Sequence, residues 1–375
     1  MLKRVTNLAE SLSPPLRLLI AAGGVLLAAL ALLAPVTVIA QTPVPGAPQN
    51  LQDTGLYADF KTLAVDPRHL AFTPQYPLWS DGAAKRRWLS LPPGGVIDGS
   101  DPDAWVFPVG TRFWKEFSFR GQRIETRYLE RQADGEWLYA AYTWSPDGGE
   151  ATLTSQKGRR NAYQLAAGRS HTIPSVDDCK ACHQGVRSEI LGFSTLQLSR
   201  DRDPFALHAE PRSFPDVDVN YLIEKGLLIG FPQKLVNTAP RFVAASATER
   251  AALGYMHGNC GHCHNDQGPL KNLGLFLRHI SADRTQSAAV TTTVGHPIKK
   301  RAPGQSPDAV LRVEARHPQG SALLERMASR YPPLQMPPLG TELVDKDAVA
   351  LIYRWISGLD ASPAEPNSQA KGHSQ

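Results

Sequence analysis

The chain has 375 residues, of which 42% are apolar and 20% are charged, so it exceeds the roughly 250 to 300 residues at which a single hydrophobic core stops growing. Its net charge of +5 is small and is carried without an acidic or basic tail, which argues against nucleic-acid binding. We therefore expect two domains and no nucleic-acid partner.

Residues 1–40 have the pattern of an export signal. Basic residues precede a long apolar run, and Val38 and Ala40 stand at the small-residue positions of a cleavage site that would leave Gln41 as the first mature residue. The run from Leu16 to Ala40 also approaches the roughly 20 apolar residues that cross a bilayer, so an uncleaved membrane anchor is the alternative. Either reading places the rest of the chain in the periplasm. Removing three basic and one acidic residue with this segment lowers the net charge from +5 to +3.

Residues 55–168 predict a β-rich domain. The runs "TRFWKEFSF", "RIETRYLERQ" and "EWLYAAYTWS" are short, rich in aromatic and β-branched residues and separated by turn signals, as expected of an antiparallel meander. In the first run, alternation places Phe113, Phe117 and Phe119 on one face together with Lys115.

The pattern changes after this region. Residues 169–243 hold the first of two cysteine motifs and a connector with scattered prolines, whereas "SATERAALGYMHGNC" and "DKDAVALIYRWISGL" have helical spacing and helix-capping residues. We expect a helical domain over residues 244–360 and a disordered, polar tail over residues 361–375. The expected apolar stripe of the last helix consists of Val349, Ile352, Tyr353 and Ile356.

All four cysteines belong to two copies of Cys-x-x-Cys-His. Two thiols at this spacing can add to the two vinyl groups of one porphyrin, and the histidine that follows can then coordinate the iron. Each copy therefore predicts one covalently attached haem c. The expected attachment and proximal residues are Cys179, Cys182 and His183 for the first haem, and Cys260, Cys263 and His264 for the second.

Other uses of paired cysteines explain the pattern less well. A zinc site needs four ligands, and one shared by the two pairs would leave His183 and His264 without a reason for their positions. A redox dithiol normally accompanies a βαβ pattern that is absent here. Disulfides across two residues would restrict the unfolded chain little. His262, between the cysteines of the second motif, is expected to point away from the ring and to be inert.

The sixth ligand of the second haem is expected to be Met336. It lies in "YPPLQMPPLG", where prolines stiffen the chain, and a histidine and methionine pair gives an iron of high potential. Met256 and Met327 fall on expected helices and are read as core residues.

No methionine lies between Met1 and Met256 to serve the first haem. The sixth position of that haem therefore stays open among several histidines and a vacant site. The histidines considered are His69, His171, His208 and His257.

The segments "ERAALGYMHGNCGHCHNDQGPL" and "MPPLGTELVDKDAVALIYRWI" resemble the class I cytochrome c domain, in which Tyr353 and Trp355 would pack the last helix across the first. Nearly all of the mature chain is similar to a family of exported bacterial di-haem c-type cytochromes with a β-rich N-terminal region. The resemblance implies a multidomain fold: an antiparallel β-rich N-terminal domain and an all-α cytochrome c-like C-terminal domain. It implies no particular substrate.

These expectations combine into a periplasmic di-haem cytochrome that carries single electrons between a donor and an acceptor protein, without catalytic side chains. The alternative is a peroxidase-like di-haem oxidoreductase with an open iron site at His183. A third interpretation is a binding module whose β-rich domain recognises a partner or a sugar. The ligand at the sixth position of the first haem separates the first two.

Overall fold

The computed structural model describes residues 43–212, 215, 217–281 and 287–360. The predicted signal peptide or anchor, residues 1–40, and the predicted disordered tail, residues 361–375, lie outside this part. Within the described ranges, the helices are all too short or too polar to cross a membrane.

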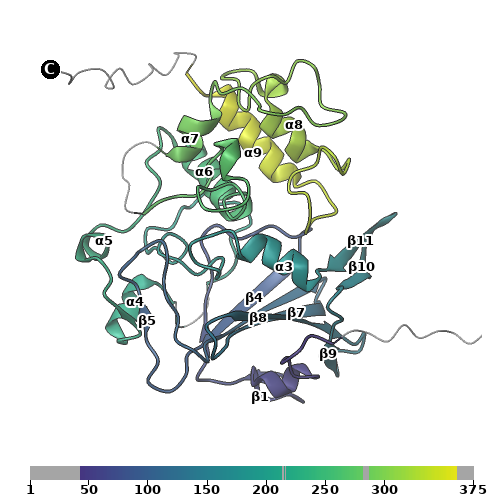
Figure 1. Cartoon of the computed structure of the whole chain (residues 1–375), viewed down its shortest axis with the longest axis vertical. Coiled ribbons are helices and arrows are strands. Elements are labelled where there is room, and N and C mark those ends of the chain that lie inside the picture. Colours follow the sequence, from purple (N-terminus) through teal and green to yellow (C-terminus); the bar gives the residue numbers. More distant parts are fainter. Residues whose placement is uncertain (1–42, 213–214, 216, 282–286, 361–375) are drawn as a thin grey trace, which may run out of the picture. The chain divides into compact units, whose positions relative to one another are not determined.

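An antiparallel sheet of six strands organises the N-terminal half (Figure 1). Its strands, in spatial order, are β3 (Leu70–Ala71), β4 (Ala84–Ser90), β6 (Arg112–Phe119), β7 (Gln122–Arg131), β8 (Trp137–Trp144) and β9 (Ala151–Leu153). β6, β7 and β8 form the predicted meander, and the two residues of the β6–β7 turn, Arg120 and Gly121, both have positive φ, as a tight hairpin requires. The prediction of a β-rich region is confirmed.

The two faces of the sheet differ in what they bury. One face packs Trp88, Trp114, Tyr128 and Tyr142 against the 3₁₀ helix η1 (Leu51–Thr54). The opposite face holds two apolar clusters, one around Phe113 and Tyr139 and the other around Phe117 and Ile124. Between these clusters, three basic residues stand directly opposite one another on neighbouring strands. This cationic row consists of Arg87 on β4, Lys115 on β6 and Arg127 on β7.

Short elements surround the sheet and connect it to the helices. They are β1 (Tyr57–Asp59), β2 (Ala64–Val65), β5 (Ile97–Asp98), β10 (Arg159–Ala166), β11 (Arg169–Ile173), α3 (Val176–His183), α4 (Val219–Glu224), β12 (Leu228–Ile229) and α5 (Gln233–Asn237). The helix α3 packs against β8, which brings the first cysteine motif to the face of the sheet that carries the cationic row.

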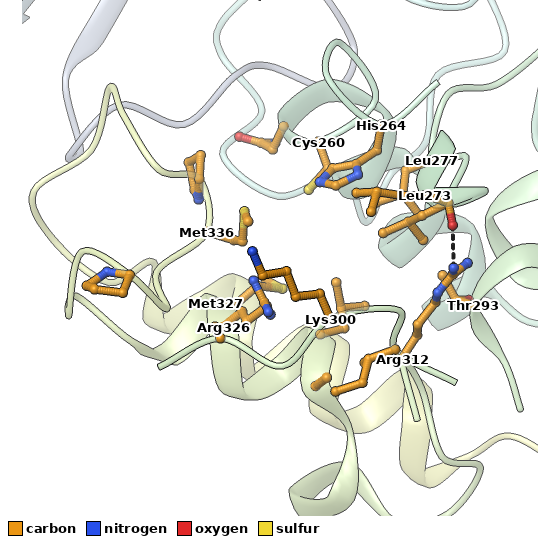
Figure 2. A pocket seen from close by; sticks show the side chains of 18 of the residues that line it. Cys260, His264, Leu273, Leu277, Thr293, Lys300, Arg312, Arg326, Met327 and Met336 are labelled. Carbon is orange, nitrogen blue, oxygen red and sulfur yellow. Dashed lines mark hydrogen bonds between the residues drawn. The ribbon is translucent and has the colours of Figure 1, made fainter. Parts of the chain in front are cut away.

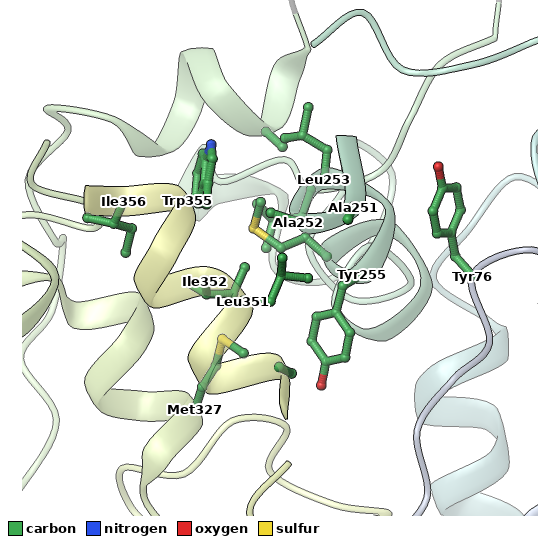
Figure 3. Close-up of a cluster of buried hydrophobic side chains, with 14 of the residues drawn as sticks. Tyr76, Ala251, Ala252, Leu253, Tyr255, Met327, Leu351, Ile352, Trp355 and Ile356 are labelled. Atoms are coloured by element: carbon green, nitrogen blue, oxygen red, sulfur yellow. The ribbon is translucent and has the colours of Figure 1, made fainter. Parts of the chain in front are cut away.

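The C-terminal region contains four short α-helices and two 3₁₀ turns. They are α6 (Ala247–Asn259), η2 (Lys271–Leu273), α7 (Ala288–Thr293), η3 (Pro318–Gly320), α8 (Ala322–Ala328) and α9 (Lys346–Ser357). Ser246 caps α6 and Asp345 caps α9, each by accepting a backbone N–H. α6 and α9 pack together around Leu253, Ile352 and Trp355 (Figure 3).

The predicted fold class is wrong in this region. Residues 244–360 do not form an all-α cytochrome c-like domain, because the chain between α6 and α9 consists mostly of turns, short helices and isolated β-bridges. Leu311, for example, bridges both Pro297 and Ser321. The segment "HPIKKRAPGQSPDAV" explains the error, since its prolines and glycine interrupt helices, while the prediction rested on the two flanking helices.

The last helix is also only partly as predicted. Trp355 is buried against α6, and its indole N–H donates to Glu249 over 3.2 Å. Tyr353, by contrast, is 42% exposed and does not belong to the buried stripe. The stripe of α9 is therefore formed by Leu351, Ile352, Trp355 and Ile356.

Candidate functional site

The first cysteine motif lies on a short helix with a well-defined start. Ser175 and Asp178 form a capping box at the N-terminus of α3, each side chain accepting the other's backbone N–H. The helix ends at His183, so Cys179, Cys182 and His183 all lie within two turns of one element. This local structure follows from the sequence "SVDDCKACH".

The second motif follows directly after α6. The backbone N–H of Cys260 donates to Met256, and that of His264 donates to Cys260, so the chain forms hydrogen-bonded turns through the motif after α6 ends at Asn259. Asn265 then closes the loop, since its side chain contacts the backbone of Gly261 and Gly268.

The two motifs meet. The sulfur atoms of Cys182 and Cys263 and a ring nitrogen of His262 lie within 4.8 Å of one another. The backbones of the two motifs are also close together beside these side chains. A Cβ at Gly268 would lie 2.8 Å from the carbonyl oxygen of Gly185. His262 was expected to be inert, yet the structure places it against the other motif.

The second motif borders a cavity of about 400 Å³, here called the His264 cavity (Figure 2). This volume falls in the range of roughly 300 to 1,000 Å³ typical of ligand sites. Cys260, His264 and Met336 all face it, and leucines, among them Leu273 and Leu277, supply apolar walls. The fold therefore brings the predicted proximal histidine and the predicted sixth ligand into one cavity.

Three arginines of the His264 cavity have no carboxylate partner among the described residues. Arg312 donates to the carbonyl oxygens of Gly274 and Leu273, and Arg326 donates to the side chain of Gln305. Arg330 donates to backbone carbonyls in the same way. Burial lowers the pKa of each guanidinium. An occupant with carboxylate groups would relieve this excess of positive charge.

The first motif borders a second cavity, here called the His183 cavity, of about 150 Å³. Cys179, Cys182 and His183 line it, together with the cationic row, Tyr139, Pro337 and residues 339–341. This volume is below the range typical of ligand sites. A large ring could enter only if walls such as the 337–341 segment moved outward.

Both predicted proximal histidines are held in the neutral form. Burial lowers the pKa of His183 to about 4. Its hydrogen bond with the backbone of Glu189 acts in the opposite direction, and nearby cations lower the pKa further. Its Nδ1 lies 2.5 Å from the carbonyl oxygen of Glu189. Because a carbonyl can only accept, Nδ1 carries the proton and Nε2 keeps a free lone pair. Burial and neighbouring cations also lower the pKa of His264 to about 4, and its buried Nδ1 has no hydrogen-bond partner among the residues that the structure describes.

The first cysteine of each motif does not have the lowered pKa of a redox dithiol, although a hydrogen bond with Cys182 lowers the pKa of Cys263. Burial raises the pKa of Cys179 to about 11 and that of Cys260 to about 12. A hydrogen bond with Cys263, followed by burial, raises the pKa of Cys182 to about 12. Reactive thiols of the Cys-x-x-Cys type need a lowered pKa in the first cysteine, so this environment disfavours the thioredoxin-like interpretation.

A zinc site is also a poor match. The cluster of Cys182, His262 and Cys263 offers three ligands where a structural zinc site uses four. It would also leave Cys179, Cys260, His183 and His264 unused. The donors at the two cavities, Cys179, Cys182 and His183 at one and Cys260 and His264 at the other, fit a covalently attached haem better. The His264 cavity adds a thioether and uncompensated arginines to that fit.

The histidines considered for the sixth position of the first haem lie elsewhere. Among the described residues that line the His183 cavity, His69, His171, His208 and His257 are absent. Each has another partner: His69 contacts the carbonyl of Gly55, His171 contacts Glu125, His208 contacts Asp345, and His257 accepts the backbone N–H of His279.

The cations that line the His183 cavity were not singled out as site residues by the sequence. The signal was present in "FWKEF", where Lys115 alternates with phenylalanines on an inward face, but its neighbours Arg87 and Arg127 come from other strands. In comparisons with protein-family models, curated proteins and solved structures, no match to this chain was found.

Proposed function

We propose that the protein is an exported di-haem c-type cytochrome that carries single electrons between periplasmic donor and acceptor proteins. The observation that carries the proposal is that each Cys-x-x-Cys-His motif borders a cavity, the first with Cys179, Cys182 and His183 and the second with Cys260 and His264. Cys182 of the first motif also lies within 4.8 Å of Cys263 of the second. When bound, haem supplies an iron that cycles between ferrous and ferric states.

In the His264 cavity, Cys260 and Cys263 would hold the porphyrin, and His264 and Met336 would be the axial ligands. The leucine walls would shield part of a porphyrin from water, which together with a thioether ligand would favour a high potential. The three arginines without carboxylate partners would neutralise the two propionates of a haem.

In the His183 cavity, Cys179, Cys182 and His183 would hold the first haem. The hydrogen bond from His183 to Glu189 fixes the orientation of the imidazole and raises its strength as a ligand. Since the attachment residues Cys182 and Cys263 are neighbours, haems on the two motifs would adjoin, which suits transfer of an electron from one to the other.

The partners would be proteins, and an acidic one is favoured at the second site. Lys299, Lys300 and Arg301 are exposed residues on the border of the His264 cavity. A basic rim of this kind would steer an acidic electron donor or acceptor toward the cavity. Electron exchange with such a partner should slow as ionic strength rises.

The test is a haem count with a reductive titration, on protein purified from a host that attaches haem c. The wild type should hold two haems and accept two electrons reversibly. A variant with Cys179→Ala and Cys182→Ala, and another with Cys260→Ala and Cys263→Ala, should each hold one haem. A chain without haem would refute the proposal, and rapid turnover of peroxide would favour the oxidoreductase alternative instead.

A further inference from the structure

Lys115 is the central member of the cationic row and has no polar partner among the described residues. On one side, Arg87 forms an ion pair with Glu210, and on the other, Arg127 pairs with Glu125 over 2.7 Å. The Nζ of Lys115 has only the face of the Phe117 ring, whose centroid is 4.9 Å away.

A positive charge on Lys115 is unfavourable at this position. Like charges directly opposite each other on neighbouring strands repel, and here two arginines flank one lysine in that arrangement. Two carboxylates serve the two arginines, so the positive charge that remains uncompensated is that of Lys115. The residue lines the same cavity as Cys179, Cys182 and His183.

Other side chains cannot readily supply a sixth ligand there. Within the described residues that line the His183 cavity, methionine is missing, and the histidines are His183 and His262. His262 lies within 4.8 Å of the thiol of Cys182, on the attachment side. Lys115 comes instead from the sheet that faces α3, so a ring held by α3 would lie between the helix and the lysine.

We propose that Nζ of Lys115 is the sixth ligand of the first haem. The inference rests on the proposed function, since it requires a haem at Cys179 and Cys182. A lysine ligates only as the neutral amine, and burial beside Arg87 and Arg127 disfavours a further positive charge at this point. The same surroundings that make an ammonium unfavourable therefore favour the form with a free lone pair.

The experiment uses ferric protein with haem attached only at the first motif, in the Cys260→Ala, Cys263→Ala background. Electron paramagnetic resonance and near-infrared magnetic circular dichroism report the spin state and the type of axial ligand. The variants are Lys115→Leu, which removes the amine, and Lys115→Arg, which keeps a positive charge but cannot ligate. The matched controls are Lys85→Leu and Lys85→Arg, because Lys85 lies on the same sheet face and donates to the carbonyl of Leu78 over 2.7 Å.

We expect a low-spin first haem with the signature of a nitrogen pair before substitution. Both Lys115 variants should abolish the low-spin signal, added imidazole should restore it, and both Lys85 variants should retain it. A high-spin haem before any substitution would overturn the assignment without the need for a variant that folds. A low-spin spectrum that survives Lys115→Arg would also overturn it, because another group must then occupy the sixth position.

The haem count separates this inference from the proposed function. If no haem is attached at Cys179 and Cys182, both fail together. If the haem is attached and the lysine variants leave its spectrum unchanged, only the assignment of Lys115 fails.

Discussion

Met336 and Met327 offer a matched pair for testing a single axial ligand, since both line the His264 cavity. Met327 is buried in the core between α6, α8 and α9, whereas Met336 lies on the loop that faces His264 (Figures 2 and 3). In Met336→Leu the second haem should lose its thioether ligand, and its potential should fall. Met327→Leu, a nearly volume-conserving change, should cost less than about 1.5 kcal/mol of stability and leave the spectrum unchanged. An unaltered spectrum in Met336→Leu would refute the ligand assignment.

His171 should make the stability of the protein depend on pH. Burial opposes its protonation, but the carboxylates of Asp81, 4.0 Å away, and of Glu125, in a hydrogen bond of 3.0 Å, outweigh burial, and the pKa of His171 is raised above its usual 6.5. A raised pKa in the folded state stabilises the fold below the unfolded value of about 6.5, and this contribution disappears as pH rises through the folded value. His171→Asn should therefore lose more stability at pH 6 than at pH 9.

The check is thermal unfolding of both proteins at the two pH values. An equal loss of melting temperature at pH 6 and pH 9 would mean that His171 is neutral in the fold. His69→Asn is a suitable control, because His69 contacts the backbone carbonyl of Gly55 rather than a carboxylate.

The residues that sequence could predict are those whose geometry is local. The two thiols and the imidazole of each motif lie within five consecutive residues, so the spacing alone sets their relative positions. The haem-attachment motifs could therefore be predicted without knowledge of the fold. The sixth ligand that we propose for the first haem depends on strand pairing far along the chain. His171 is close to Cys179 in sequence but turns to Glu125 on β7, while Lys115 reaches the His183 cavity from β6.

At the scale of elements, the close approach of α6 to Tyr76 makes Gly254 sensitive to substitution. A Cβ at Gly254 would lie 1.9 Å from the Tyr76 ring, which is buried and held by a hydrogen bond to Asp203. Figure 3 shows Tyr76 on the side of α6 away from α9. Gly254→Ala should therefore destabilise the fold by about 1 to 3 kcal/mol, although alanine is the better helix former.

Chemical unfolding measures this effect, and Gly358→Ala is the control. A Cβ at Gly358 would meet its nearest atom at 3.4 Å, which is an ordinary contact. If Gly254→Ala were as stable as the control, the close contact between α6 and the Tyr76 ring would be refuted.

The elements themselves were predictable where their pattern repeats within a few residues. Alternating aromatic residues identified β6, β7 and β8, and capping residues with apolar spacing identified α6 and α9. The chain between α6 and α9 has no such period. Its bridges, such as Val294 with Val313, join residues far apart in sequence, and the all-α prediction failed there because two end helices do not determine what lies between them.

At the scale of the whole molecule, the contact between Cys182 and Cys263 predicts that two haems influence each other. Adjoining ferric haems should couple magnetically, so the electron paramagnetic resonance spectrum of the two-haem protein should differ from the sum of the two one-haem variants. Oxidation of one should also shift the potential of the other. A spectrum equal to the simple sum would show that the two sites are independent.

The central claim is that both motifs carry covalent haem, and the intact mass of the protein tests it most directly. The protein should be made in a host that attaches haem c and measured under denaturing conditions, which remove any group that is not covalently bound. The account predicts a mass equal to the polypeptide plus two haems. The mass of the bare polypeptide, or of one lighter by the hydrogens lost in disulfides, would contradict it.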